Sequence, residues 1–436
     1  MVRDRDWQER FDQAELLTVK EEDLSIALEN WQVENISNQS LTRSSLRVID
    51  DGNLGGNTGF GQSDKAWQEL LEGAEQSVQY GDEAVFSFSQ HSLSSFHERN
   101  ENNFNSVSED QLIDFIGEVL EFFRRSAPEV TLNLSLGKSY SEIELRTSRS
   151  ARLRENRSNF GLMVSIPIPG GGSRFYRVFE QDEMFTKLPE AELTEFLREY
   201  EKAGEVSSPA TGRMPVIFTP RALYFFTVSL TEGIGADNIY RQTSPLQEKL
   251  GERIFSPAIN ITDRPHMEDA GSRRYFDDEG IPTRQQVIVD EGVLENYIYD
   301  LEHAARMEEK PRGNGLKRSL FSSGMGVPVS PSLVNPVIDP GETDKEDMIS
   351  GLNEGIMVEN IVGFHSSNYS QGHFSVQAHG YHIQEGELKG RLEDVMIAGN
   401  IYEDFMEVEA VGDKLYPGSY GYYPYMLVPD IQVSAR

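Results

Sequence analysis

Apolar residues recur along the chain with two periods, and each period predicts one kind of element. In Ser63–Gln79, and again after the Ser108-x-x-Gln111 capping box, apolar residues return every three or four positions, which indicates amphipathic helices. A third such helix is expected over about Pro189–Lys202. Shorter runs of apolar and polar residues predict strands; these runs are Glu15–Val19, Leu24–Asn30, Ser45–Ile49, Val130–Leu136, Glu142–Thr147, Ser150–Arg154, Gly161–Ile168 and Phe175–Phe179.

Glycine-rich segments separate some of these runs. Asp50–Gly61 has the composition of a phosphate-binding loop, but it lacks the GK[ST] ending and the G-x-G-x-x-G spacing at a strand-to-helix junction. We therefore interpret it as a glycine-rich hairpin. Pro169–Ser173 predicts a hairpin turn between the last two strands.

The inward face of the second helix is expected to hold Leu112, Ile113, Phe115, Ile116, Val119, Leu120 and Phe123.

A change in composition marks the expected domain boundary. Ala203–Met214 is rich in small residues, serine, proline and glycine, as exposed linkers are. We therefore expect an N-terminal domain over 1–208 and a C-terminal domain over 209–436. The predicted fold class is α+β: antiparallel strands with two or three helices come first, and a β-rich domain with few short helices follows.

The second half opens with a predicted strand, Pro215–Phe218, and a helix over about Pro220–Glu232. Ile254–Ile261 is expected to be a short strand. The turn residues Asp290–Gly292 predict a hairpin between two β-rich runs. Thr343-x-x-Glu346 is expected to cap a further helix, whose inward residues would be Met348, Ile349, Leu352 and Ile356.

The charge of the chain excludes one broad class of function. Its 72 acidic and 40 basic residues give a formal net charge of -32, and only 11 of the basic residues are lysines. Non-specific nucleic-acid binding needs clustered lysine and arginine, so no nucleic-acid partner is expected. An acidic, lysine-poor surface suits a high-salt cytoplasm, where ions screen self-repulsion; an acidic protein from an ordinary habitat is the alternative.

Other features of composition set the expected compartment. The chain has no cysteine, which excludes disulfides and thiolate metal sites. No apolar run approaches the roughly 18 residues of a membrane span, and the first residues lack the apolar core of a signal peptide. We therefore expect a soluble cytoplasmic protein that has no membrane partner.

One stretch of the second half resembles a known family. Lys249–Asp300 is similar to the TldD/PmbA family, whose PmbA-type members are also called TldE. The similarity continues through Gly313–Gly315, Gly386–Leu388 and Ile397–Asn400, and it is looser over the first domain. The resemblance implies an α+β first domain, a β-rich second domain and a two-subunit assembly that encloses a chamber.

The resemblance also identifies what this chain lacks. TldD-type subunits are zinc metallopeptidases with an H-E-x-x-x-H motif on the helix after the strand that opens the second domain. That chemistry needs two imidazoles, a glutamate that activates the zinc-bound water, and a further ligand. Counting back from Lys249, Thr227 and Glu232 stand in place of the histidines, and Val228 in place of the catalytic glutamate. The family's further ligand is a late cysteine, which is absent. The resemblance therefore implies the PmbA/TldE branch, with no catalytic residue or metal in this chain and zinc in a TldD-like partner.

The late histidines offer an alternative metal site. His373 and His379 are six positions apart, so on a continuous strand they share one face, whereas His382 points to the other. Spacing alone does not make a ligand set. The favoured interpretation is that they are surface or interface histidines.

A carboxylate cluster lies inside the resembling stretch. Asp277, Asp278 and Glu279 would suit acid/base chemistry, but together with Gly280 they also have the composition of a turn. The triplet belongs to the signature that the family shares in subunits with and without metal. A structural role, or contact with peptide or with another subunit, is therefore the favoured interpretation.

The tail is rich in tyrosine and glycine. Tyr420, Tyr422 and Tyr423 are expected either to contact another subunit or the peptide chamber, or to pack against the β core.

The sequence therefore predicts a PmbA/TldE-like, non-catalytic subunit of a TldD/TldE-type metallopeptidase complex that acts on unfolded peptides. The expected partner is a TldD-like catalytic subunit, and the chain alone is expected to form a homodimer. Two alternatives are a metallopeptidase with a rearranged metal site and a stand-alone structural or peptide-binding protein.

Overall fold

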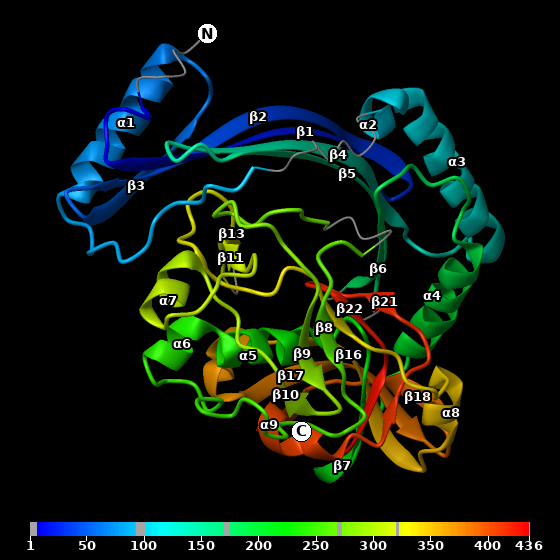
Figure 1. The fold of residues 1–436 in the computed structure, drawn as a ribbon. Coiled ribbons are helices and arrows are strands. Elements are labelled where there is room, and N and C mark those ends of the chain that lie inside the picture. The colour runs from blue at the N-terminus through cyan, green and yellow to red at the C-terminus, as the bar shows by residue number, and fades with distance from the viewer. Residues whose placement is uncertain (1–6, 93–101, 169–173, 268–272, 320–321, 436) are drawn as a thin grey trace. The chain divides into compact units, whose positions relative to one another are not determined.

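The computed structural model describes most of the chain (Figure 1), namely residues 7–92, 102–168, 174–267, 273–319 and 322–435. The chain packs as two compact units, which are described separately below. Unit 1 consists of Met1–Tyr200, His266–Thr283 and Asp300–Ser330, and unit 2 of Glu201–Pro265, Arg284–Tyr299 and Pro331–Arg436. Because two segments of the second half pack with unit 1, chain order alone does not divide the molecule, and the boundary at residues 208/209 stays a prediction.

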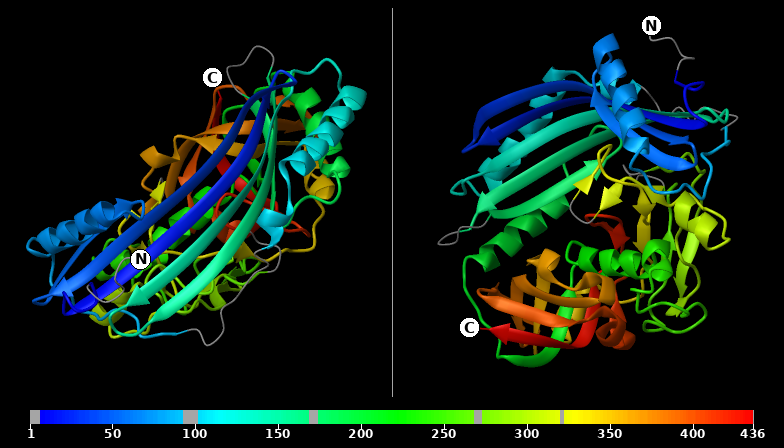
Figure 2. Two further views of the ribbon diagram at one scale, coloured as in Figure 1. Left: turned by 90° about the horizontal axis from the view of Figure 1, so that it is seen from above. Right: turned by 90° about the vertical axis from the view of Figure 1, so that its left-hand side faces the viewer.

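Unit 1 is built on one antiparallel sheet of six long, curved strands in the order β3-β2-β1-β4-β5-β6 (Figure 2). Their bounds are β1 Gln13–Glu29, β2 Gln32–Asp50, β3 Asn53–Phe60, β4 Asn133–Thr147, β5 Arg152–Pro167 and β6 Arg174–Gln181. The glycine-rich segment is confirmed as a hairpin, because β3 pairs with β2 from Asn53 to Phe60. The predicted turn Pro169–Ser173 lies outside the described residues.

Several strands that the sequence separated are continuous. Glu15–Val19 and Leu24–Asn30 were predicted as two strands, but both fall in β1, and only Asn30 lies beyond it. The charged residues 20–23 between them pair with both β2 and β4. The separation was wrong because ladder hydrogen bonds use the backbone, which polar side chains on an exposed face do not interrupt. The two runs in β4 and the two in β5 join in the same way.

Helices cover parts of unit 1, with α1 near one end of the sheet and α2 and α3 near the other (Figure 1). The bounds are α1 Asp64–Val78, α2 Asn102–Ser106, α3 Glu109–Ser126, α4 Glu190–Ala203 and α7 Leu301–Arg306. The capping box Ser108–Gln111 is confirmed at the start of α3. The inward assignment of Ile113 was wrong, since this side chain is 47% exposed.

The core of unit 1 lies between the sheet and its helices, and also where Phe276 and Met325 of the later segments pack against Leu17 and Leu145. On α1, Leu70, Leu71, Ala74 and Val78 are buried in a cluster that includes Trp7 and Leu46, as an amphipathic helix requires. At the other end, Phe196 of α4 stacks on Phe175 of β6, with ring centroids 5.0 Å apart. The segment Asp300–Ser330 adds short pairings, β11 with β14 and β12 with β13; their bounds are β11 Gly315–Leu316, β12 Arg318–Ser319, β13 Ser322–Ser323 and β14 Ser330–Pro331.

Unit 2 contains a closed ring of strands. The order β16-β7-β23-β19-β17 closes because β16 also pairs with β17, and β18 and β20 extend it. The bounds are β7 Gly212–Phe218, β16 Glu354–Val362, β17 His373–Gln384, β18 Glu387–Arg391, β19 Val395–Asn400, β20 Ala410–Val411 and β23 Met426–Ala435. The predicted strand that opens this half is confirmed as β7.

A second sheet of unit 2 has the order β10-β9-β8-β15-β22-β21. Its strands are β8 Ile261–Asp263, β9 Gln286–Asp290, β10 Val293–Leu294, β15 Pro336–Ile338, β21 Tyr416–Pro417 and β22 Tyr422–Tyr423. The predicted hairpin is confirmed, since β9 and β10 are joined by Glu291 and Gly292 with φ of 43° and 79°. The prediction of a strand over Ile254–Ile261 was wrong except at Ile261, where β8 begins. The amides of Ile254 and Phe255 donate to the turn carbonyl of Gly292 instead of to a strand.

The helices of unit 2 are short, as the sequence predicts. They are α5 Tyr224–Ile234, α6 Ala236–Tyr240, α8 Lys345–Ser350, α9 Ile401–Asp404, η1 Phe364–Ser366, η2 Tyr369–Gln371 and η3 Phe405–Glu407. The N-cap of α8 is Asp344 rather than Thr343, because the Asp344 carboxylate accepts from the amide of Glu346. Ile356 lies in β16 and not in this helix. The α+β fold class is confirmed, and no helix in the described ranges is long and apolar enough to cross a membrane.

Candidate functional site

Helix α5 of unit 2 carries the positions at which the family's metal motif would fall. It follows β7 and is buried on most sides, with Phe225 and Phe226 packed in an aromatic cluster around Phe405. A helix that is apolar all round belongs to a core. Thr227, Val228 and Glu232 all lie on this helix, as predicted.

Thr227 is held by neutral hydrogen bonds. Its hydroxyl donates to the carbonyl of Tyr224 at 3.1 Å and lies 3.0 Å from the hydroxyl of Tyr423. If the threonine proton stays on this carbonyl, the tyrosine is the donor to Thr227; either hydroxyl can donate in this contact. Both side chains are buried, and this contact joins α5 to β22. It places Tyr423, but not Tyr420 or Tyr422, against the degenerate motif.

Glu232 has its own set of partners. One carboxylate oxygen accepts from Asn238 Nδ2 at 3.2 Å. Burial raises the pKa of Glu232, the nearby Asp237 adds to this rise, and the hydrogen bond from Asn238 opposes it. Burial, together with the charge of Glu232, also raises the pKa of Tyr402. Its surroundings therefore favour the neutral form of Glu232 more than water does.

These residues do not fit the zinc site of the family. A neutral threonine whose oxygen is already bound to a tyrosine is a poor ligand, and the half-buried Val228 has no group that takes up a proton. Among the residues that the structure describes, no group of three or more histidine, cysteine, aspartate or glutamate residues is placed to hold a metal ion.

The late histidines lie on β17, as predicted. His373 is exposed and His379 is half-buried, and burial lowers the pKa of His379. Six residues at about 3.3 Å each place their Cα atoms about 20 Å apart along a strand. One ion is bound at about 2 Å from each ligand, so the two rings do not meet at a single metal.

His382 is buried, although a surface or interface position was favoured for these histidines, and it makes contacts that sequence reasoning missed. Its Nδ1 lies 2.7 Å from Ser207 Oγ, and its Nε2 lies 2.8 Å from Glu354 Oε1. This histidine therefore fixes the segment before β7 to the strand ring of unit 2.

A second group of candidate residues lies in unit 1. Arg47 of β2 stands opposite Glu15 of β1 in the strand register. Its Nε donates to Glu15 at 2.8 Å and its Nη1 to Glu279 at 2.9 Å. Side-chain exposure is 12% for Arg47, 1% for Glu15 and 2% for Glu279. The three groups form a buried ionic bridge between the sheet and the signature turn.

The signature turn 277–280 is held mainly by backbone amides. Asp277 accepts from the amides of Glu279 and Ile281 at 3.0 and 2.8 Å, and from Gly315 at 2.9 Å. Asp278 is paired with Arg274 and accepts from the amide of Lys317 at 2.7 Å. These two carboxylates have a structural role inside unit 1, while a role in peptide or interface contact stays a prediction.

Gly280 completes the turn with φ of +72°. A Cβ on this residue would lie 2.8 Å from Leu145 Cδ2 and 3.1 Å from Leu153 Cδ1, so only glycine fits without a shift. Its carbonyl also accepts from Ser89 Oγ at 2.7 Å.

The pKa values of the carboxyl groups of the turn are shifted in different directions. The pKa of Glu279 is raised to about 7, because burial, Asp300 and Glu15 together raise it by more than Arg47 lowers it. Burial and the charge of Glu279 raise the pKa of Asp277 well above its ordinary value. Although burial acts to raise the pKa of Asp278 as well, the Arg274 guanidinium holds it below its ordinary value.

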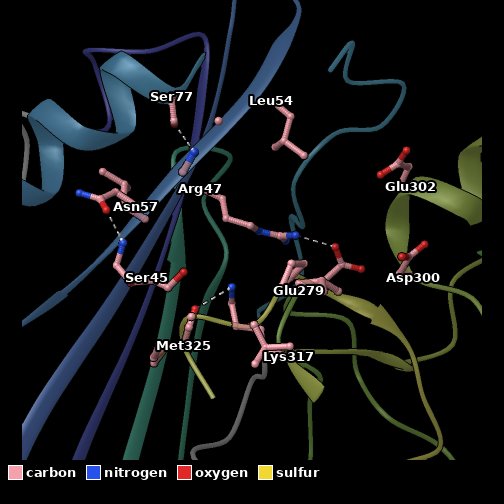
Figure 3. Close-up of a pocket in the computed structure, with 18 of the residues that line it drawn as sticks. Ser45, Arg47, Leu54, Asn57, Ser77, Glu279, Asp300, Glu302, Lys317 and Met325 are labelled. Atoms are coloured by element: carbon pink, nitrogen blue, oxygen red, sulfur yellow. Dashed lines mark hydrogen bonds and ion pairs between the residues drawn. The ribbon is translucent and has the colours of Figure 1, made fainter. Parts of the chain in front are cut away.

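Glu279 lines a pocket of about 550 Å³ that lies entirely within unit 1 (Figure 3). The pocket is bounded by strands β2 and β3, by α1 through Ser77, by the start of α7, and by the loop after β13. Its charged lining residues are Arg47, Glu279, Asp300, Glu302 and Lys317, and its apolar lining includes Leu54, Phe86, Val327 and Val329. A volume of this size is typical of small-molecule sites, at about 300–1,000 Å³.

Sequence reasoning missed the basic residues of this pocket. Lys317 is buried, and burial lowers its pKa, as does the nearby Arg47. One signal was available for Arg47. An arginine within the apolar run Leu46–Ile49 needs a buried partner, and Glu15 in an apolar run of β1 provides it. The contact with Glu279 had no sequence signal.

The family model described as PmbA/TldA metallopeptidase C-terminal domain matches residues 211–435. The chain therefore belongs to the TldD/PmbA family of metallopeptidase-like proteins. Its fold is similar to the crystal structure of TldE from Thermococcus kodakarensis, with a TM-score of 0.84 over 98% of each chain and 21% sequence identity.

Related metalloprotease sequences are similar to less than half of this chain, a shorter region than the structural match covers. A metalloprotease of Methanocaldococcus jannaschii is 30% identical over 205 residues, which cover 46% of this chain and 43% of the relative. A zinc metalloprotease TldD homolog of Saccharolobus solfataricus is 26% identical over 206 residues, or 47% of this chain and 45% of the relative. The chain thus spans less than half of the length of these relatives.

Proposed function

We propose that this chain is the PmbA/TldE-like, non-catalytic subunit of a TldD/TldE-type peptidase assembly. One observation carries the proposal. On α5, the position of the first metal-binding histidine is occupied by Thr227, whose hydroxyl is hydrogen-bonded to Tyr423 in the core of unit 2. A hydroxyl in this arrangement neither binds zinc well nor activates water.

The proposed partner is a TldD-like subunit that carries the H-E-x-x-x-H motif and the zinc. In this assembly the present chain completes the chamber and helps to present unfolded peptide to the partner's metal. Tyr420 and Tyr422 are half-buried residues beside the core contact of Tyr423, and we assign them to the surface that contacts the partner or the peptide. The proposed compartment is the cytoplasm.

The experiment uses the purified chain and a homologue with the H-E-x-x-x-H motif from the same source. Cleavage of an unfolded, fluorescently labelled casein is measured with each protein alone and with both together. We expect no cleavage by the chain alone and a gain of cleavage on mixing. A mixture in which the motif glutamate of the homologue is replaced by glutamine serves as the control and is expected to be inactive.

Cleavage by the isolated chain that is lost on chelation would overturn the proposal. In that case the double variant His373→Ala/His379→Ala separates the alternatives, because a site rebuilt around these histidines requires them. If the variant kept full activity, the metal would lie elsewhere in the chain.

A further inference from the structure

The pocket of unit 1 has charged groups of opposite sign in its lining (Figure 3). Lys317 lies on the segment after β11, while Asp300 and Glu302 lie at the start of α7. Arg47 also lines the pocket; its Nε and Nη1 are engaged by Glu15 and Glu279, while its Nη2 has no hydrogen-bond partner among the described residues. The groups left to bind a ligand are therefore the lysine ammonium and this Nη2 on the positive side, and the carboxylates at the start of α7 on the negative side.

The ammonium group of Lys317 has unused donor capacity. Its three N–H groups make one hydrogen bond within the described residues, a long one of 3.4 Å to the carbonyl of Met325. The residue is only 7% exposed. A buried ammonium with free donors favours an anionic acceptor, because leaving the donors unbound costs free energy.

The α7 carboxylates have unused acceptor capacity. Asp300 is 4% exposed. Its Oδ1 accepts from the amide and the ring of His303, each at 2.8 Å, and its Oδ2 has no donor among the residues that the structure describes. Glu302 is paired with Arg306 at 2.9 Å and is more exposed. This part of the pocket favours a cationic group.

The same charges exclude ligands with one sign only. A phosphate-rich anion would face Glu279, Asp300 and Glu302, and a polyamine would face Lys317 and Arg47. A ligand with one positive and one negative group satisfies both sides. The apolar lining residues Leu54, Phe86 and Val327 offer contact to the aliphatic part of such a ligand.

We propose that this pocket binds a zwitterionic ligand of the amino-acid or short-peptide class, with its carboxylate at Lys317 and its ammonium group at Asp300. A volume of about 550 Å³ accommodates a dipeptide. This site lies wholly in unit 1 and does not depend on the proposed subunit role, so failure of one leaves the other standing.

The first test measures binding of leucyl-alanine and of the other Xaa-Ala dipeptides, each titrated separately into the full chain by calorimetry. Two blocked forms of the tightest binder follow, one with an acetylated amino group and one with an amidated carboxyl group. We expect each block to weaken binding about 10- to 100-fold, since each removes a charge-assisted hydrogen bond. If no dipeptide binds with a Kd below about 10 mM, or if a blocked form binds as well as the free peptide, the proposal is overturned.

The second test assigns the two ends with variants. Asp300→Asn keeps an N-cap side chain for α7 but removes the charge, so it is expected to weaken the free peptide about ten-fold and the acetylated form hardly at all. Lys317→Met is expected to weaken binding of the free peptide about ten-fold and binding of the amidated form hardly at all. If a variant weakened binding of the free and the blocked peptide equally, the assignment of the two peptide ends to Asp300 and Lys317 would be contradicted.

A third variant blocks the pocket without breaking its charges. A Cβ at Gly326 meets no atom within 4 Å, so Gly326→Leu places a side chain in open space beside the ligand. Gly117→Leu on α3 is the matched control, because its Cβ is equally unhindered and it is not among the lining residues. We expect Gly326→Leu to abolish binding and Gly117→Leu to leave it unchanged. Binding that survives Gly326→Leu would contradict the location.

Discussion

The guanidinium of Arg47 donates through Nη1 to Oε1 of Glu279 at 2.9 Å, and this contact joins residues that lie 232 positions apart in the chain. The same guanidinium binds Glu15 on the neighbouring strand. A segment from the second half of the chain is thereby fixed to the first-half sheet by a buried charge network. Breaking such a network by removing one partner leaves uncompensated charge in the interior.

The first prediction concerns this network. Arg47→Met is expected to lower the free energy of unfolding of unit 1 by about 3–5 kcal/mol, because two buried carboxylates lose their cation. Urea unfolding followed by tryptophan fluorescence measures the loss. Arg10→Met removes the exposed pair with Glu75 and is expected to cost at most about 1 kcal/mol. Equal losses for the two variants would show that the buried bridge contributes no more than a surface pair.

The second prediction concerns pH. Glu279 has a pKa of about 7 in the folded chain and 4.5 when unfolded, so between these values the folded state holds a proton that the unfolded state has lost. The contribution of Glu279 to stability therefore falls as pH rises from about 4.5 to 7, by at most about 1.4 kcal/mol per pH unit, and is constant above that. The charged groups that act on Glu279 are Arg47 of β2, Glu15 of β1, Asp277 of its own turn, Asp300 beside α7, and Lys317.

Glu279→Gln removes this titration and provides the measurement. The unfolding free energies of wild type and variant are measured from pH 4.5 to 8. The value for the wild type minus that for the variant is expected to decrease with rising pH and to level off near pH 7. Using the difference cancels the contribution of carboxyl groups that Glu279 does not influence; the change at Asp277, whose pKa the charge of Glu279 raises, is part of the measured shift. A difference that does not change with pH, or that shifts in favour of the wild type, would contradict the raised pKa.

The third prediction concerns Gly280. Gly280→Ala is expected to destabilise unit 1 by more than about 1 kcal/mol, since it adds both left-handed backbone strain and a clash with Leu145. Gly52→Ala is the matched control. Its φ of +81° is similar, but its Cβ meets no atom within 4 Å. Thermal unfolding of both variants separates strain from crowding, and similar losses would show that crowding at Gly280 is unimportant.

The fourth prediction concerns the degenerate motif. Thr227→Val leaves the buried hydroxyl of Tyr423 without this partner and is expected to cost about 1–3 kcal/mol. Tyr423→Phe removes the other half of the pair. In a double-mutant cycle the two losses are expected to be less than additive by about 1 kcal/mol. Strict additivity would mean that the hydroxyl pair carries no interaction energy, and that Thr227 is not committed to the core.

Local features of the fold could be predicted from the sequence because their causes are local. The capping box of α3, the apolar face of α1 and the turn Asp290–Gly292 depend on residues a few positions apart. The continuity of β1 was missed because the charged residues 20–23 look like a break between two strands in the sequence. Their backbones are nevertheless paired on both sides.

The candidate sites divide in the same way. Thr227, Val228 and Glu232 were found through family resemblance, and their place on α5 follows from the strand–helix pattern. The partner of Thr227 is Tyr423, 196 positions away, and no periodicity predicts that contact. Similarly, Asp277 and Asp278 were recognised as turn residues, but the pKa of Glu279 depends on burial and on charges from three other segments. The sequence identifies such groups, and only the fold reveals their surroundings.

The central claim is that this chain holds no catalytic metal and joins a partner that does. Native mass spectrometry with zinc analysis tests it most directly, first on the isolated chain and then after mixing with a homologue that carries the H-E-x-x-x-H motif. The account predicts no bound zinc in the isolated chain and a zinc-containing heteromer on mixing. Stoichiometric zinc in the isolated chain, or no association with the homologue, would contradict it.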